Sequence, residues 1–230
     1  MKILNVEQGS PEWREARRCK ITGTRLEDVM GTSLAQLMLI CELIAEEGTE
    51  QVKQFRSTPE MERGTAEEPF AIKRFTDQTG KETEQVGICI SEEFSYLACS
   101  PDRLRKENGV YVEGIEVKNP DTKTAIFYKI SSLIDNEELK LSASKKTFLG
   151  IPSEYKWQVL NYFLVIPTLT KVSFVVHDAR FISEDVKLHI IEIERDNEEV
   201  QSELEKAKKT LIEFREKWLK YKQIALPDNF

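Results

Sequence analysis

The chain has few of the residues that build disulfide scaffolds or histidine-based metal sites. Its 230 residues contain only two histidines, and its four cysteines (Cys19, Cys41, Cys89 and Cys99) include no Cys-x-x-Cys pair. Zinc and iron–sulfur sites need closely grouped cysteines or histidines, and disulfides are uncommon in intracellular proteins. We therefore expect reduced, mostly buried thiols, and neither a structural zinc nor an iron–sulfur cluster.

Long hydrophobic runs are also missing. No apolar segment approaches the length of a membrane span, and the first residues, "MKILNVEQGS", lack the apolar core of a signal peptide. Glycine and proline are sparse, at 10 and 8 residues, and no repeat or low-complexity tract is present. A length of 230 residues fits one large domain with a full core. We expect a single domain over residues 1–230, cytoplasmic and without a membrane partner.

Positive charge is in deficit, with a net charge of -7 at pH 7. Phosphate binding requires Lys and Arg, so this balance weighs against a nucleic-acid partner. DNA responds to the local field, however, and two segments are basic: "RRCK" near the N-terminus and the stretch from Lys140 to Lys146. The overall charge therefore does not exclude DNA.

Hydrophobic periodicity predicts helices first, then a strand meander, then a helix, two strands and a long final helix. Helical spacing covers residues 10–18, 32–47 (with a buried apolar stretch at 34–44), 58–80, 124–134, 153–166 and 198–224. Period-two alternation covers residues 84–91, 94–100, 110–119, 171–180 and 187–196. Ser10 and Ser153 are candidate N-caps, and Gly80 is a candidate C-cap. Short polar turns, one of them containing Asn108 and Gly109, would join the strands of the meander, and "ITGT" would form a loop after the first helix. The last helix has an apolar stripe made of Val200, Leu204, Leu211, Phe214, Trp218 and Tyr221. The order predicts a mixed α/β (α+β-type) fold with a central mixed β-sheet flanked by helices.

The segment "LACSPDRLRKENGVYVEGIEVKNP" carries the candidate chemistry. Glu116 and Lys118 occupy alternate positions of a predicted strand and so share a face, and a hairpin-like return would bring Asp102 beside Glu116. Two neighbouring carboxylates repel unless a cation neutralises them, and Mg²⁺ favours such pairs. A lysine beside the metal can orient or deprotonate water, or stabilise developing charge. The alternative is a turn aspartate next to an exposed Glu–Lys pair on an edge strand.

These residues resemble a known nuclease core. "SPD" followed by "IEVKNP" is similar to the core of the phage lambda exonuclease family, the alkaline-exonuclease viral recombinases of the PD-(D/E)xK superfamily. The segments "WREARRCKITGT", "ERGTAEEPFA", "YKWQVLNYF" and "IEIERD" resemble further family landmarks in the same order. The match runs from Trp13 to about Asp196. It implies a restriction-endonuclease-like core.

Carried over by position, the resemblance assigns a metal and catalytic site. It implies that Asp102, Glu116 and the backbone carbonyl of Val117 bind Mg²⁺, and that Lys118 is the catalytic lysine. Glu68 would complete the site near a second metal ion or its waters. The implied cofactor is thus two Mg²⁺ ions per site, for which Mn²⁺ can substitute.

Four more residues follow from the same resemblance. Gln158 would face the site and order the water or the DNA, and the 5′-phosphate of the substrate strand would be bound by Arg17, Thr24 and Ser100. A guanidinium and two hydroxyls are a suitable clamp for a terminal phosphate.

The sequence departs from the family pattern at two positions and is ambiguous at two others. Thr24 replaces the usual serine and keeps the hydroxyl, whereas Asn119 follows the lysine where a cysteine is frequent. Glu67 adjoins Glu68, so the choice of Glu68 rests only on its spacing from Gly64, and Arg18 beside Arg17 creates the same ambiguity for the phosphate clamp.

The function implied by the resemblance is a Mg²⁺-dependent 5′→3′ exonuclease acting on linear double-stranded DNA ends. It would release mononucleotides and leave a 3′ overhang for phage-type recombination. The resemblance also implies a ring-shaped homotrimer, a single-strand annealing protein as partner, and a phage or prophage origin within a bacterial host. Three alternatives stay open: a restriction-type endonuclease on the same core, a non-catalytic DNA-end-binding or protein-binding module, and a purely structural α/β protein.

Overall fold

A four-stranded mixed sheet forms the centre of the computed structural model, which describes residues 1–51, 57–133, 139 and 146–227. The strand order is β4 (Arg103–Glu107), β5 (Val110–Lys118), β8 (Lys171–His177) and β9 (Leu188–Glu194). β5 and β8 are parallel, and the two outer pairings are antiparallel. The predicted fold class, a mixed sheet with helices around it, is confirmed.

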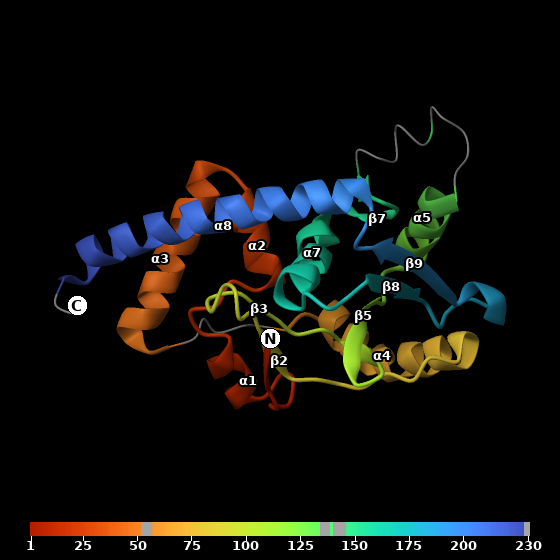
Figure 1. Ribbon diagram of the computed structural model, residues 1–230. Coiled ribbons are helices and arrows are strands. Elements are labelled where there is room, and N and C mark those ends of the chain that lie inside the picture. The colour runs from red at the N-terminus through yellow and green to blue at the C-terminus, as the bar shows by residue number, and fades with distance from the viewer. Residues whose placement is uncertain (52–56, 134–138, 140–145, 228–230) are drawn as a thin grey trace.

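Helices cover both faces of this sheet (Figure 1). On one face, α4 (Pro59–Thr79) packs Ala71 and Phe75 against Ile115 and Val117 of β5. On the other face, α7 (Lys156–Val165) lies between the sheet and α8 (Glu198–Ala225). Side chains alternate along β5, so Glu116, which lies between Ile115 and Val117, points away from α4 and towards α7. Glu116 is therefore directed into the interior on the α7 side.

The remaining elements build outward from this core. The other described helices are α1 (Pro11–Ala16), α2 (Gly23–Met30), α3 (Ser33–Thr49), α5 (Thr122–Leu133), η1 (Ser153–Tyr155) and η2 (Glu184–Val186). A separate three-stranded sheet contains β1 (Lys2–Leu4), β2 (Ile88–Ile90) and β3 (Ala98–Cys99), and β6 (Thr147–Phe148) pairs with β7 (Ile151–Pro152). α2 packs against α7, which brings the N-terminal segment to the central sheet.

Local sequence signals explain several element boundaries. The Ser10 hydroxyl accepts a hydrogen bond from the backbone N–H of Trp13, so Ser10 caps α1 as predicted. Gly80 ends α4 with φ +68°, a left-handed conformation that favours glycine. Asn108 and Gly109, with φ +51° and +80°, close the β4–β5 hairpin. Ser153 is not the predicted cap, because it lies in η1 and Tyr155 occupies the N-cap position of α7.

The three strands predicted as a meander do not lie in one sheet, so this prediction is wrong. β2 pairs with both β1 and β3 in the three-stranded sheet, whereas β5 pairs with β4, which the sequence had placed in a polar turn. β4 was missed because "RLRKE" is dominated by charged residues. α2 was also missed, since its first residues had been assigned to a loop.

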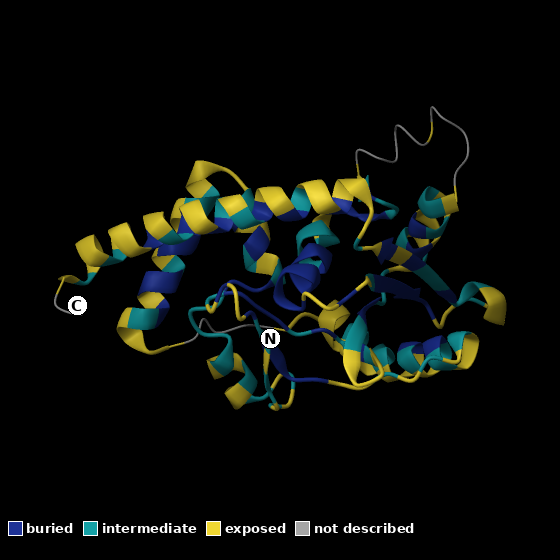
Figure 2. Cartoon of the chain, in the orientation of Figure 1, coloured by how far each residue is buried: buried dark blue, intermediate teal, exposed yellow. Residues whose placement is uncertain are grey.

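Burial differs from expectation in three places (Figure 2). α3 buries only one side, and Leu34 and Met38 are 67% and 62% exposed, so this helix is not the fully buried element that was predicted. On α8 the predicted apolar stripe is buried except for Tyr221. All four cysteines are free; Cys89 and Cys99 are buried, whereas Cys19 is half-buried and Cys41 exposed. The basic stretch at 140–145 lies outside the described residues.

Candidate active site

The β4–β5 hairpin brings Asp102 and Glu116 together. Arg103 is paired with Ile115, so Asp102, one residue before β4, stands across from Glu116. The carboxylate of Asp102 also accepts a hydrogen bond of 2.7 Å from the backbone N–H of Val117. The predicted juxtaposition of the two carboxylates is therefore present, and backbone pairing creates it.

Glu116 is the centre of a buried polar network. Its side chain is only 1% exposed, and β5 is an inner strand, so the alternative of an exposed Glu–Lys pair on an edge strand is wrong. One carboxylate oxygen accepts hydrogen bonds from Lys118 and, at 2.6 Å, from the amide of Gln158. The other oxygen accepts from the hydroxyl of Tyr162. Three donors from β5 and α7 thus hold one buried carboxylate in place.

Burial and mutual repulsion govern the charges of this cluster. Burial, with the nearby negative charge of Glu116, raises the pKa of Asp102 well above its usual value. Burial by itself would lower the pKa of Lys118, but the attraction of Glu116 and Asp102 outweighs that effect and raises it. Lys118 is consequently an ammonium in the metal-free chain, and its single positive charge does not fully offset the two carboxylates.

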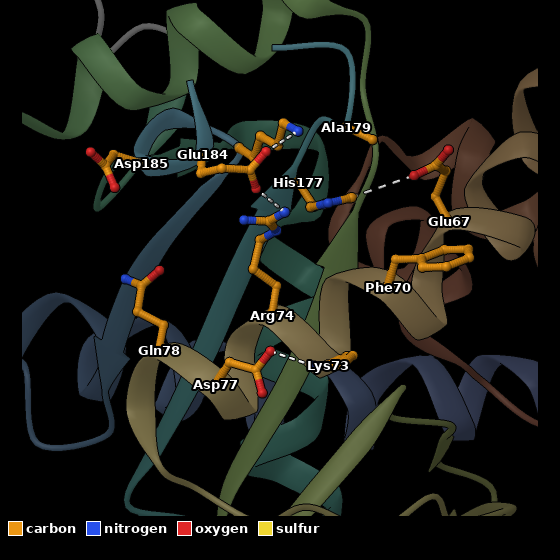
Figure 3. Close-up of a pocket in the computed structure, with 11 residues that line it drawn as sticks. Glu67, Phe70, Lys73, Arg74, Asp77, Gln78, His177, Ala179, Glu184 and Asp185 are labelled. Atoms are coloured by element: carbon orange, nitrogen blue, oxygen red, sulfur yellow. Dashed lines mark hydrogen bonds and ion pairs between the residues drawn. The ribbon is translucent and has the colours of Figure 1, made fainter. Parts of the chain in front are cut away.

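Glu67 and Glu68 point to different neighbours, although they are adjacent on α4. Glu68 accepts a hydrogen bond of 3.1 Å from Arg103, and burial raises its pKa, with Arg103 opposing and Glu116 adding to the shift. Glu67 instead faces His177, at 3.8 Å, and lines a pocket of about 770 Å³ between α4 and η2 (Figure 3). The side chain that approaches Asp102 and Glu116 is thus Glu68.

Asn119 links α4 to the end of β5. Its amide donates to the carbonyl of Gly64 at 3.1 Å, and its side-chain oxygen lies 3.0 Å from Nδ1 of His177. Arg63 donates to the Asn119 carbonyl at 2.9 Å. These contacts fasten the helix that carries Glu68 to the strand that carries Glu116.

The donor set suits a small divalent cation bound with incomplete protein coordination. Among the described residues, no three His, Cys, Asp or Glu side chains form a metal-binding group, so a cage made of such side chains is not found there. Mg²⁺ commonly takes one or two carboxylates and completes its shell with water and phosphate oxygens. A cation at Asp102 and Glu116 would also relieve the repulsion from Glu116, which adds to the effect of burial in raising the pKa of Asp102. The two carboxylates therefore fit the implied Mg²⁺.

Two of the three residues assigned to the phosphate clamp meet at one tryptophan. The guanidinium of Arg17 stacks over the Trp13 ring at 4.2 Å, and the Trp13 indole donates to the Ser100 hydroxyl at 2.8 Å. Burial, reinforced by the positive charge of Arg25, lowers the pKa of Arg17 to about 10, which leaves it charged at neutral pH. Arg18 instead pairs with Glu15 at 2.6 Å.

Thr24 is not joined to this group by a hydrogen bond; Arg17 donates to Thr22, at 3.3 Å. Thr24 is exposed in the first turn of α2. That turn packs closely on α7, since a Cβ on Gly23 would lie 2.9 Å from the Gln158 side chain. The glycine thus allows the α2 turn to approach the site that contains Gln158.

Tyr162 and Thr22 make polar contacts at the site that the sequence did not predict. Tyr162 lies four residues after Gln158, so both point from the same side of α7. This spacing was visible in "QVLNY", but an aromatic residue in an apolar helix reads first as core packing. Its hydrogen bond to Glu116 becomes apparent only when α7 is placed on the sheet.

Comparison with known proteins matches the chain to a viral recombinase family and to exonuclease structures. A family model of the YqaJ-like viral recombinase domain matches residues 12–171. An alkaline exonuclease (LHK-Exo) from Laribacter hongkongensis is 26% identical, with a TM-score of 0.69 over 94% of this chain and 98% of that one. The same enzyme in complex with dAMP matches at 27% identity, with equal coverage and TM-score.

A phage-related exonuclease from Haemophilus somnus 129PT shares the fold, with 17% identity and a TM-score of 0.59 over 90% of this chain and 95% of that one. A search of curated proteins found no match. Among the described residues, no helix is long and apolar enough to cross a membrane. The family model covers more than half of the sequence, and the resemblance seen in "SPD" and "IEVKNP" is thereby confirmed: the chain belongs to the YqaJ-like viral recombinase family.

Proposed function

We propose that this DNA exonuclease depends on Mg²⁺, degrades the 5′-ended strand of linear duplex DNA to mononucleotides and leaves a 3′ overhang. The observation that carries the proposal is the network around Glu116. Lys118, Gln158 and Tyr162 donate to that buried carboxylate, while Asp102 stands across from it. A structural protein has no use for so many charged groups in its interior, because their burial is costly.

Each residue of the network has a distinct proposed role. Asp102, Glu116 and the Val117 carbonyl would hold the cation, and Glu68 would complete the site at a second ion or its waters. Bound Mg²⁺ would supply Lewis-acid stabilisation of the scissile phosphate. Lys118, an ammonium in the metal-free chain, donates hydrogen bonds but does not accept them. This form orients water or stabilises developing charge.

Gln158 and Tyr162 would act through Glu116 by fixing the orientation of its carboxylate. Gln158 and Tyr162 lie on the same side of α7, and they donate hydrogen bonds to different oxygens of Glu116. Groups that support a metal ligand in this manner tune its affinity and geometry. Mn²⁺ is expected to replace Mg²⁺, because both take oxygen ligands.

The proposed 5′→3′ polarity rests on the group at Trp13. Arg17 and Ser100 both contact that ring system, and a terminal 5′-phosphate bound there would select the strand to be cut. Thr24 would join the clamp from the adjacent first turn of α2. No contact of Thr24 with Arg17 or Ser100 supports this third assignment, which stays a prediction.

The wider setting is proposed from the family. The chain would act as one nuclease domain in a ring-shaped homotrimer that encloses DNA, in the cytoplasm of a bacterium that carries a phage or prophage. A single-strand annealing protein would receive the 3′ overhang. A heterologous interface closes into a ring when the rotation between subunits permits it.

A strand-specific degradation assay tests the proposal. Linear duplex DNA with a 5′-phosphate on one strand only is incubated with the protein in Mg²⁺ or EDTA, and both strands are followed. Loss of the phosphorylated strand to mononucleotides, only in Mg²⁺, is the expected result. Discrete internal fragments would favour a restriction-type endonuclease. End binding without cleavage by the wild type would make the chain a binding module.

A further inference from the structure

Tyr155 contacts the catalytic lysine in a way that the proposed mechanism does not use. The ammonium of Lys118 lies 4.7 Å from the centre of the Tyr155 ring, over its face. Tyr155 ends η1 and immediately precedes α7, the helix that carries Gln158. The N-terminal end of α7 thus contacts both residues: Gln158 donates to Glu116, and the Tyr155 ring lies against Lys118.

The ring is supported from the sheet. Tyr155 is half-buried and packs on Phe174 of β8, with ring centres 5.4 Å apart and planes tilted by 39°. Phe174 is fully buried, and β8 is the parallel neighbour of β5. The aromatic contact to Lys118 is therefore held by the same two strands that set the position of Lys118 itself.

Among the described residues, the other partners of Lys118 are proposed metal ligands. Glu116 forms an ion pair with the ammonium, and Asp102 attracts it electrostatically. A divalent cation at those carboxylates would compete for the same negative charge. An aromatic face attracts an ammonium through its quadrupole, and it is not a ligand for Mg²⁺. A bound cation would not compete for the Tyr155 ring.

We propose that Tyr155 is a positioning residue whose ring holds the Lys118 ammonium in place when its carboxylate partners bind the metal. This inference rests on the proposed function, in which Lys118 acts in the chemical step. The ring is the acting group, so the phenol hydroxyl is dispensable. Cation–π contacts of this kind correspond to effects on the order of 10-fold.

Two substitutions separate the ring from the hydroxyl. Tyr155→Phe keeps the aromatic face, and kcat on 5′-phosphorylated duplex should stay within about twofold of wild type. Tyr155→Leu removes the face, and kcat should fall on the order of 10-fold with KM and with DNA binding in Ca²⁺ unchanged. Tyr155→Met is a second apolar replacement in case the leucine variant folds poorly. Equal losses in the Phe and Leu variants would overturn the proposal.

A double-mutant comparison tests whether the ring acts through Lys118. In a Lys118→Ala background, adding Tyr155→Leu should cause no further loss in single-turnover rate, because the contact is already gone. The full 10-fold loss in that background would also overturn the proposal. Tyr111→Leu is the matched control. The ammonium of Lys106 lies 4.4 Å from the centre of the Tyr111 ring on the β4–β5 hairpin, and removal of that ring should leave kcat unchanged.

A spectroscopic measurement needs no activity at all. In protein labelled with ¹³C-lysine, the side-chain Hε signal of Lys118, identified by its loss in Lys118→Arg, should be shifted upfield by the ring. The shift should persist in Tyr155→Phe, vanish in Tyr155→Leu, and remain on addition of Mg²⁺. An unshifted Lys118 signal in the wild type sinks the inference about Tyr155, whereas an inactive wild type with a shifted signal sinks the proposed function instead.

Discussion

The carboxylate of Asp102 accepts a 2.7 Å hydrogen bond from the backbone N–H of Val117. This bond fastens Asp102 to the strand residue that separates Glu116 from Lys118. The position of Asp102 is therefore fixed by the strand, and not by a loop that could adjust. A rigid carboxylate pair is ready for a cation, but it carries unrelieved repulsion until the cation binds.

Asp102→Asn is expected to stabilise the metal-free protein at neutral pH. The folded pKa of Asp102 is raised, so the native state binds more protons than the unfolded state at pH values between the ordinary and the raised pKa. Stability contributed by this group is present at low pH and is lost as pH rises through that window. Asparagine can still accept from Val117 and has no charge. Urea unfolding in EDTA should show a gain at pH 7.5 that shrinks towards pH 4.

Mg²⁺ should reverse this order of stability. A ligand that binds only the native state raises its stability by mass action, so the wild-type melting temperature should increase with Mg²⁺ concentration. Asp102→Asn should respond weakly, since one of the two proposed carboxylate ligands is gone. Equal Mg²⁺ responses of the two proteins would remove Asp102 from the metal site.

Tyr162→Phe should weaken catalysis without disturbing the fold. The change removes only the hydroxyl that donates to Glu116, and the ring still fills the space beside Gly114. Loss of a group that supports a metal ligand typically costs 10–100-fold in metal affinity or activity. Titration of the rate with Mg²⁺ should show a higher half-saturating concentration. Tyr128→Phe, a buried tyrosine of α5, is the control and should leave that concentration unchanged.

The two adjacent glutamates of α4 give a matched pair. Glu68→Gln should lower kcat about 10–100-fold, because Glu68 approaches Asp102 and Glu116. Glu67→Gln should change kcat by no more than about twofold, since Glu67 faces His177 and the pocket instead. Steady-state rates on the same DNA substrate provide the measurement. The opposite ranking would assign the catalytic role to Glu67.

Arg17 and Arg18 form a second matched pair. Arg17→Ala should reduce the preference for 5′-phosphorylated over 5′-hydroxyl ends by roughly 10–100-fold, as expected for a lost charge-assisted hydrogen bond. Arg18→Ala should retain the preference, because Arg18 is engaged with Glu15. Competition between the two DNA ends in one reaction measures the ratio directly. A preference that survives Arg17→Ala would place the phosphate contact elsewhere.

Local patterns in the sequence were sufficient for much of the fold. The caps at Ser10 and Gly80, the Asn108–Gly109 turn and the alternation along β5, β8 and β9 depend on neighbours within a few residues. Those effects are decided by backbone sterics and hydrogen bonding at short range. The pairing of strands into two sheets was not predictable in this way, because alternation indicates that a segment is a strand but not which other strand it pairs with.

The residues of the candidate site were likewise only partly predictable from local sequence patterns. Asp102, Glu116 and Lys118 could be found from the sequence because one hairpin and one strand period relate them. The resemblance supplied Glu68, Gln158 and Arg17, which come from segments far apart along the chain. It did not distinguish Glu67 from Glu68, since that choice depends on the rotation of α4 against the sheet.

The sequence by itself determined the mixed α/β architecture, the paired carboxylates and the family. Tertiary structure alone decided that Glu116 is buried on an inner strand, that Tyr162 donates to it, and that Tyr155 lies over Lys118. The physical reason is packing: α7 contributes these aromatic side chains only after it docks on β5 and β8. Local periodicity fixes which side of a helix is apolar, but the partner across the interface is set by how the whole core closes.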